Sequence, residues 1–69
     1  MGEKIRTIGV IKYKKTDYEI EENESGDGKE NIVHIQNEKF RMEILESDYV
    51  LMSALILLAA ENLRKIKLS

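Results

Sequence analysis

The sequence has no cysteine, proline or tryptophan, and it has a single histidine, His34. The absence of cysteine excludes disulfides, thiolate metal sites and cysteine nucleophiles, and it is typical of proteins in a reducing compartment. A metal ion bound by one histidine needs carboxylates as its other ligands, and no clustered spacing supplies them. We therefore expect no enzyme, no metal and no cofactor, and we expect His34 to be an exposed residue on a sheet.

Long hydrophobic runs are also missing. The longest apolar run, residues 49–60, is interrupted by Ser53. As a helix this run is roughly 18 Å long, whereas the hydrocarbon core of a bilayer is about 30 Å thick. The first ten residues, MGEKIRTIGV, carry charges within their apolar stretch, unlike a signal or transit peptide. We therefore expect a cytoplasmic protein without a membrane partner.

The length of 69 residues allows one domain, which we place over 1–69. A single core of this size contributes roughly 3 to 5 kcal/mol of net stability, so small domains without disulfides or metals are commonly stabilised by oligomerisation. A composition rich in Ile, Lys, Glu and Asn and free of Pro and Trp is typical of AT-rich bacterial or phage genomes.

Charge is distributed unevenly along the chain, although the net charge is only −2. Residues 1–15 carry five basic side chains and one acidic one, whereas residues 17–30 carry seven acidic side chains and one basic one. The net charge is far from that of a dedicated nucleic-acid binder. The candidates for contact with a partner are Glu22, Glu24, Asp27 and Glu30 in the acidic segment, and Arg6, Lys12 and Lys14 in the basic one.

Alternating apolar residues predict two hairpins, with strands over about 4–14, 17–22, 31–36 and 39–45. A turn at Lys15 and Thr16 would place Tyr13 opposite Tyr18, Ile11 opposite Ile20, Lys14 opposite Asp17 and Lys12 opposite Glu19. A turn at Asn37 and Glu38 would place Ile35 opposite Phe40 and Val33 opposite Met42. Gly9 predicts a bulge, because the apolar pattern slips there. The polar residues 23–30, NESGDGKE, predict a mobile loop.

Residues 48–66 predict a helix, since Ser47 or Asp48 can cap its start and basic residues follow at its end. Between residues 49 and 60 the helix is apolar almost all round, which indicates burial on more than one side. One stripe is expected to pack on the sheet: Met52, Leu55, Ile56, Ala59, Leu63 and Ile66. The other face must be covered either by a curled sheet or by a second copy: Val50, Ser53, Ala54, Leu57 and Ala60.

The predicted fold class is therefore α+β, an antiparallel four-stranded meander followed by one apolar helix packed on the sheet. A strand (KFRMEI), an acidic cap (ESD) and an apolar helix occupy residues 39–63. This segment resembles the C-terminal end of the tubby, LURP-one and phospholipid scramblase superfamily, in which an apolar helix threads a barrel of strands. The resemblance implies a half-barrel that needs a partner copy.

The function that these patterns favour is a non-catalytic, homo-oligomeric protein-interaction module that also binds another protein. Two alternatives stay open at this stage. The resemblance implies a binder of a ligand or lipid headgroup, and the basic strand with Tyr13 is the minimum for weak nucleic-acid binding.

Overall fold

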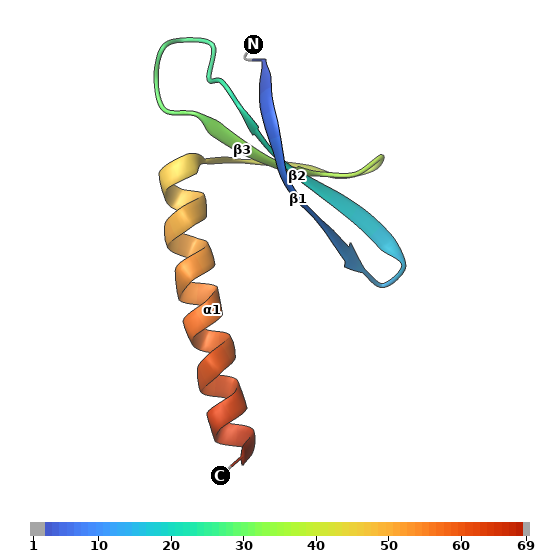
Figure 1. The fold of residues 1–69 in the computed structure, drawn as a ribbon, viewed down its shortest axis with the longest axis vertical. Coiled ribbons are helices and arrows are strands. Elements are labelled where there is room, and N and C mark those ends of the chain that lie inside the picture. The colour runs from blue at the N-terminus through green and yellow to red at the C-terminus, as the bar shows by residue number, and fades with distance from the viewer. Residues whose placement is uncertain (1–2, 69) are drawn as a thin grey trace.

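The computed structural model describes residues 3–68 and consists of a twisted sheet from which a long helix projects (Figure 1). The elements are β1 (Lys4–Tyr13), β2 (Thr16–Asn23), β3 (Ile32–Gln36), β4 (Arg41–Leu45) and α1 (Glu46–Leu68). The strands lie in the order β1-β2-β3-β4, and each neighbouring pair is antiparallel. The predicted α+β meander with one C-terminal helix that contacts the sheet is confirmed, the helix meeting β3 and β4.

The first hairpin turns one residue earlier than predicted. Lys14 and Lys15 form the turn, with φ angles of 51° and 66°. Tyr13 therefore lies opposite Thr16, and Lys12 lies opposite Asp17 and not Glu19. Two residues with positive φ give the turn the backbone of a type I′ hairpin, whose twist matches that of the strands. Because the pairing differs from the prediction by two residues, the predicted division of side chains between the faces is kept.

The pairing of the second hairpin also differs from its prediction by two residues, in the opposite direction. Ile35 pairs with Met42 and not with Phe40, so the turn lies one residue later than predicted. The Asn37 amide N–H donates to the Phe40 carbonyl at 2.8 Å. The Asn37 side-chain oxygen accepts from the amide N–H groups of Lys39 and Phe40, each at 2.8 Å. This local side-chain bonding fixes the turn at Glu38 and Lys39.

Replacing Lys14 with asparagine and Lys15 with glycine is expected to stabilise the protein by about 1 kcal/mol. Lysine is disfavoured in the left-handed region that both positions occupy, whereas Asn-Gly prefers it. The measurement is the urea midpoint at a fixed protein concentration. The matched control puts Asn-Gly at Glu38 and Lys39, which have no positive φ. The control should bring no gain, and an equal gain in both variants would contradict the turn assignment.

The predicted irregularity at Gly9 is confirmed, because the β1–β2 register shifts between Thr7 and Gly9. A second shift, between Lys4 and Arg6, was not predicted. Extra residues in one strand increase its local twist. Figure 1 shows the result, since β1 and β2 cross steeply over the other two strands.

The helix begins earlier and ends later than predicted, and its position is the main difference. Glu46 follows directly on Leu45 of β4, and the Glu46 amide N–H donates to the Asn31 carbonyl at 3.0 Å. Without a connecting loop, α1 cannot turn back along the sheet and projects away from it (Figure 1). The prediction of a stripe packed on the sheet is therefore wrong, because all six of its residues are exposed: Met52, Leu55, Ile56, Ala59, Leu63 and Ile66.

The core within the single chain is small. Among residues 3–68 the buried apolar side chains are Ile20 and Val33. The radius of gyration is 14.6 Å, whereas a compact domain of this length has about 11 Å. The described chain therefore leaves most of its apolar side chains in contact with water.

Candidate functional site

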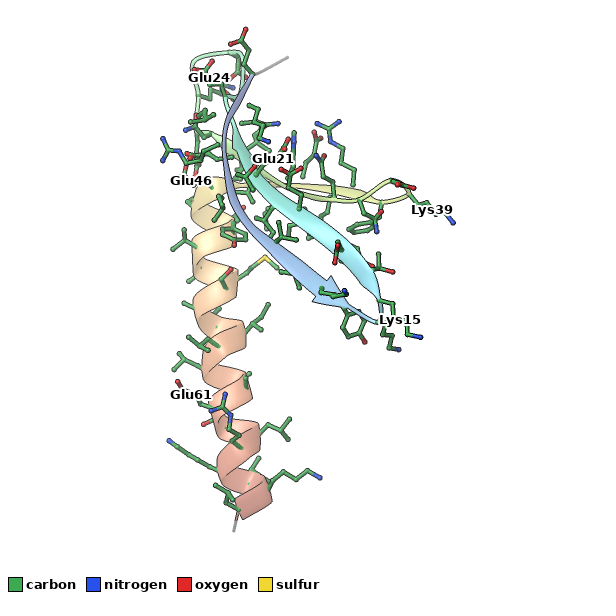
Figure 2. All side chains as sticks on the ribbon, turned by 45° about the vertical axis from the view of Figure 1, so that its right-hand side comes forward. Lys15, Glu21, Glu24, Lys39, Glu46 and Glu61 are labelled. Atoms are coloured by element: carbon green, nitrogen blue, oxygen red, sulfur yellow. The ribbon has the colours of Figure 1, made fainter. Side chains whose placement is uncertain are left out.

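More than half of the exposed large apolar side chains of residues 3–68 lie on the helix α1. Every residue from Val50 to Leu68 is exposed. Figure 2 shows side chains projecting from α1 around its whole circumference, with no other element beside its C-terminal half. Isolated helices are marginal in water, and most helical stability in proteins comes from packing of an apolar face. The exposed apolar helix is therefore the first candidate for an interface.

The five residues predicted to form a subunit interface lie together on this helix. Val50 is 60% exposed and Leu57 is 58% exposed. The smaller side chains of Ser53, Ala54 and Ala60 are exposed beside them. At about 100° per residue, all five fall within one face of α1. Their placement fits the predicted seam, and their role in assembly stays a prediction.

Three carboxylates gather where the loop meets the start of α1. Glu22 accepts a hydrogen bond from the side-chain amide of Asn31 at 2.9 Å, and its other oxygen lies 3.5 Å from the Arg6 guanidinium. The hydrogen bond to Glu22 raises the pKa of Glu46, with further contributions from desolvation and from the charges of Glu22 and Glu30. The three carboxylates outnumber the basic residues of this corner, Arg6 and Lys29.

Glu30 caps the helix. Its carboxylate accepts from the backbone N–H of Ser47, which lowers the pKa of Glu30. Sequence reasoning assigned the cap to Ser47 or Asp48, yet the capping oxygen comes from a residue 17 positions earlier in the chain. No local pattern could have revealed it, because helix capping is usually read from the adjacent residues.

The acidic loop is held by its own hydrogen bonds. The Ser25 hydroxyl donates to Asp27 at 2.7 Å, and the Lys29 amide donates to Asp27 at 3.0 Å. The Ser25 bond, followed by the Lys29 bond, lowers the pKa of Asp27. Glu24 joins the loop to the first strand, since its amide donates to the Glu3 carbonyl at 2.9 Å. The four acidic candidates for contact with a partner therefore lie in two places. Glu24 and Asp27 belong to the loop, and Glu22 and Glu30 belong to the junction with α1.

The basic candidates are separated in the same way. Arg6 lies beside Glu22 at the junction. Lys12 pairs with Asp17 across the first hairpin, and the Lys14 ammonium lies 5.4 Å from the centre of the Tyr13 ring. No continuous basic surface joins these three residues among the described strands, and each has an acidic or aromatic neighbour.

His34 is buried, with 4% of its surface exposed, so the prediction of an exposed sheet histidine is wrong. Its Nδ1 accepts from the Asn23 side-chain amide at 2.6 Å and lies 3.0 Å from Nη2 of Arg41. Its Nε2 lies 2.9 Å from a carboxylate oxygen of Glu43. The same Nη2 lies 3.4 Å from Nε2, so polar groups of Asn23, Arg41 and Glu43 enclose both ring nitrogens.

The polar face around His34 is largely self-satisfied. Glu21 is buried, and one of its oxygens lies 3.7 Å from Nδ1 of His34. Further along the face, Lys4 and the Thr7 hydroxyl each donate to Glu19, at 3.1 Å and 2.7 Å. The Thr7 bond, then the Lys4 bond, lowers the pKa of Glu19. Both ring nitrogens of His34 are engaged within the chain, which favours a structural role.

A small cavity of about 140 Å³ lies beside His34, Arg41 and Glu43. Within residues 3–68 no group of three or more histidine, aspartate or glutamate side chains is arranged to hold a metal ion. In the same part of the chain no helix has the length and apolar character to cross a membrane.

Comparison with protein-family models, curated proteins and solved structures finds no match for this chain. The resemblance of residues 39–63 to the scramblase-like superfamily stays a prediction.

Proposed function

We propose that this protein is a non-catalytic protein-interaction module that works as a homo-oligomer and associates through α1. The observation that carries the proposal is the exposure of the whole apolar helix from Val50 onward. Exposed apolar patches of this size mark interfaces in soluble proteins. The sheet alone cannot stabilise the fold, because it buries only two apolar side chains among the described residues.

The polar face supports the non-catalytic part of the proposal. A general base must reach a substrate through a free nitrogen or oxygen, whereas His34 is buried and bonded on both ring nitrogens. The buried residues Glu21 and Asn23 complete the same network. This network links β2, β3 and β4, and its role in the proposal is to stabilise the sheet.

A second, unlike protein partner belongs to the proposal as well. Once α1 is covered by assembly, the exposed charges of the loop, Glu24 and Asp27, stay at the surface. They lie at the end of the sheet away from both hairpin turns, as Figure 1 shows for the loop between β2 and β3. Nucleic acid is not proposed as a partner, because Arg6, Lys4 and Lys12 lie beside carboxylates.

The experiment is the absolute mass in solution, measured by light scattering after gel filtration over about a hundredfold range of concentration. We expect a stable multiple of the 8.0 kDa chain, with dissociation only at the lowest concentrations. A folded, helical monomer at every concentration would overturn the proposal.

A further inference from the structure

We propose that α1 pairs with the α1 of a second copy in antiparallel orientation, along the face that carries Val50, Ala54, Leu57 and Ala60, with Leu57 on the two-fold axis. The inference rests on the proposed self-association and adds its geometry. It defines which residues meet across the seam.

The exposed area is what a stable homodimer needs. The chain exposes 5850 Å², whereas a compact monomer of this mass exposes about 4,450 Å². The excess is about 1,400 Å² per chain, or roughly 2,800 Å² for two chains, which is within the range of obligate homodimer interfaces. A second copy of the chain is therefore sufficient to cover it.

The pattern of side-chain sizes suits a crossing at Leu57. Leu57 is the central residue of α1, which runs from Glu46 to Leu68. An antiparallel pair centred there sets Ala54 opposite the partner's Ala60. The facing leucines at the centre set the separation near 10 Å, the upper end of the usual interaxial range, and the small alanines on each side pack there without a clash.

Charge selects the antiparallel orientation. On this face Glu46 stands at the start of α1, and Glu61 and Arg64 stand near its end. In the antiparallel pair the partner's Arg64 lies opposite Val50, one helical turn from Glu46, and supplies positive charge to the corner that holds Glu22 and Glu30. A parallel pair would bring the two Arg64 side chains together and the two Glu46 side chains together. The helix dipoles also oppose one another favourably only in the antiparallel pair.

The sheets give a second reason for this orientation. Each sheet lies at the N-terminal end of its own α1 (Figure 1). An antiparallel pair therefore brings each sheet beside the C-terminal half of the partner helix. The sheet carries exposed apolar side chains on one face, which can cover the exposed Leu68 at the end of the partner helix: Ile11, Tyr13, Phe40 and Met42. A parallel pair leaves both C-terminal halves uncovered.

The test is disulfide cross-linking, which the full chain allows without a background because it contains no cysteine. Three single variants are oxidised under native conditions: Leu57→Cys, Val50→Cys and Arg64→Cys. With the axes about 10 Å apart and Cα atoms about 2.3 Å from each axis, residues that face each other directly have Cα atoms about 5.4 Å apart, which a disulfide can span. We expect Leu57→Cys to form a covalent dimer alone. We expect Val50→Cys to form one only when it is refolded together with Arg64→Cys.

The outcomes separate this inference from the proposed function. Efficient cross-linking of Val50→Cys with itself would show a parallel pair, and a non-covalent dimer in which Leu57→Cys fails to cross-link would show another seam. Either result overturns the antiparallel inference and leaves self-association intact. A monomeric mass for the unmodified protein overturns both. Charge reversal gives a second readout: Glu46→Arg or Arg64→Glu alone should weaken the dimer at least tenfold, and the double variant should restore it.

Discussion

Leu57→Asp is expected to raise the dissociation constant of the oligomer at least about a hundredfold, which corresponds to about 2.7 kcal/mol. Truncation of a central interface side chain commonly costs about 2 kcal/mol or more, and this variant also places a charge in the seam. With Leu57 on the two-fold axis, the two aspartates would face each other. The measurement is the mass across a dilution series.

The same variant should lose helix content. The 23 residues of α1 are held by few contacts with their own sheet, since none of them is buried in the single chain. An uncovered helix is marginal in water, so dissociation is expected to lower the helical circular dichroism signal with the mass. Association of the chains and formation of the helix α1 are then expected to be one coupled event.

The matched control is Asn62→Asp, which adds the same charge to the same helix. Asn62 lies about 140° around the helix from Leu57, and its exposed side chain is already polar. It should keep the mass and the helical signal of the unmodified protein. The proposed seam would be wrong if Leu57→Asp kept both of them as well, or if the control lost both.

The division of the sheet into two faces could be predicted from the sequence, although both turns were placed one residue away from their observed positions. Side chains alternate with a period of two along a strand, so a pairing error of two residues leaves every side chain on its predicted face. The residue types at the first turn could not reveal its position, because Lys14 and Lys15 adopt a left-handed conformation that lysine disfavours.

The position of α1 and the burial of His34 could not be predicted in this way. An apolar pattern shows that a helix needs cover, and it does not say whether its own sheet or another chain supplies that cover. The absence of a loop between Leu45 and Glu46 settles the direction of the helix, and such a boundary is uncertain by a few residues from sequence. His34 lies at an alternating polar position, and its burial depends on side chains of the two neighbouring strands, β2 and β4.

His34→Ala is expected to destabilise the protein by about 2 to 4 kcal/mol, because it leaves buried polar groups without their partner. The Asn23 amide loses its acceptor, and the buried Glu21 loses a neighbouring hydrogen-bonding ring. A domain of this size has about 3 to 5 kcal/mol from its own core, so the loss would remove most of it. The measurement is urea unfolding at a fixed protein concentration.

Two further variants test whether lost hydrogen bonds or lost side-chain volume cause this destabilisation. Gln36→Ala removes the next side chain on the same face of β3, which is only half-buried, and should cost less than about 1 kcal/mol. His34→Phe keeps a ring of similar size and removes every hydrogen bond. If the hydrogen bonds to Asn23, Arg41 and Glu43 hold β2, β3 and β4 together, phenylalanine should be as damaging as alanine. Near-normal stability of the phenylalanine variant would show instead that His34 acts by filling space, and the polar network would lose its role in holding the sheet.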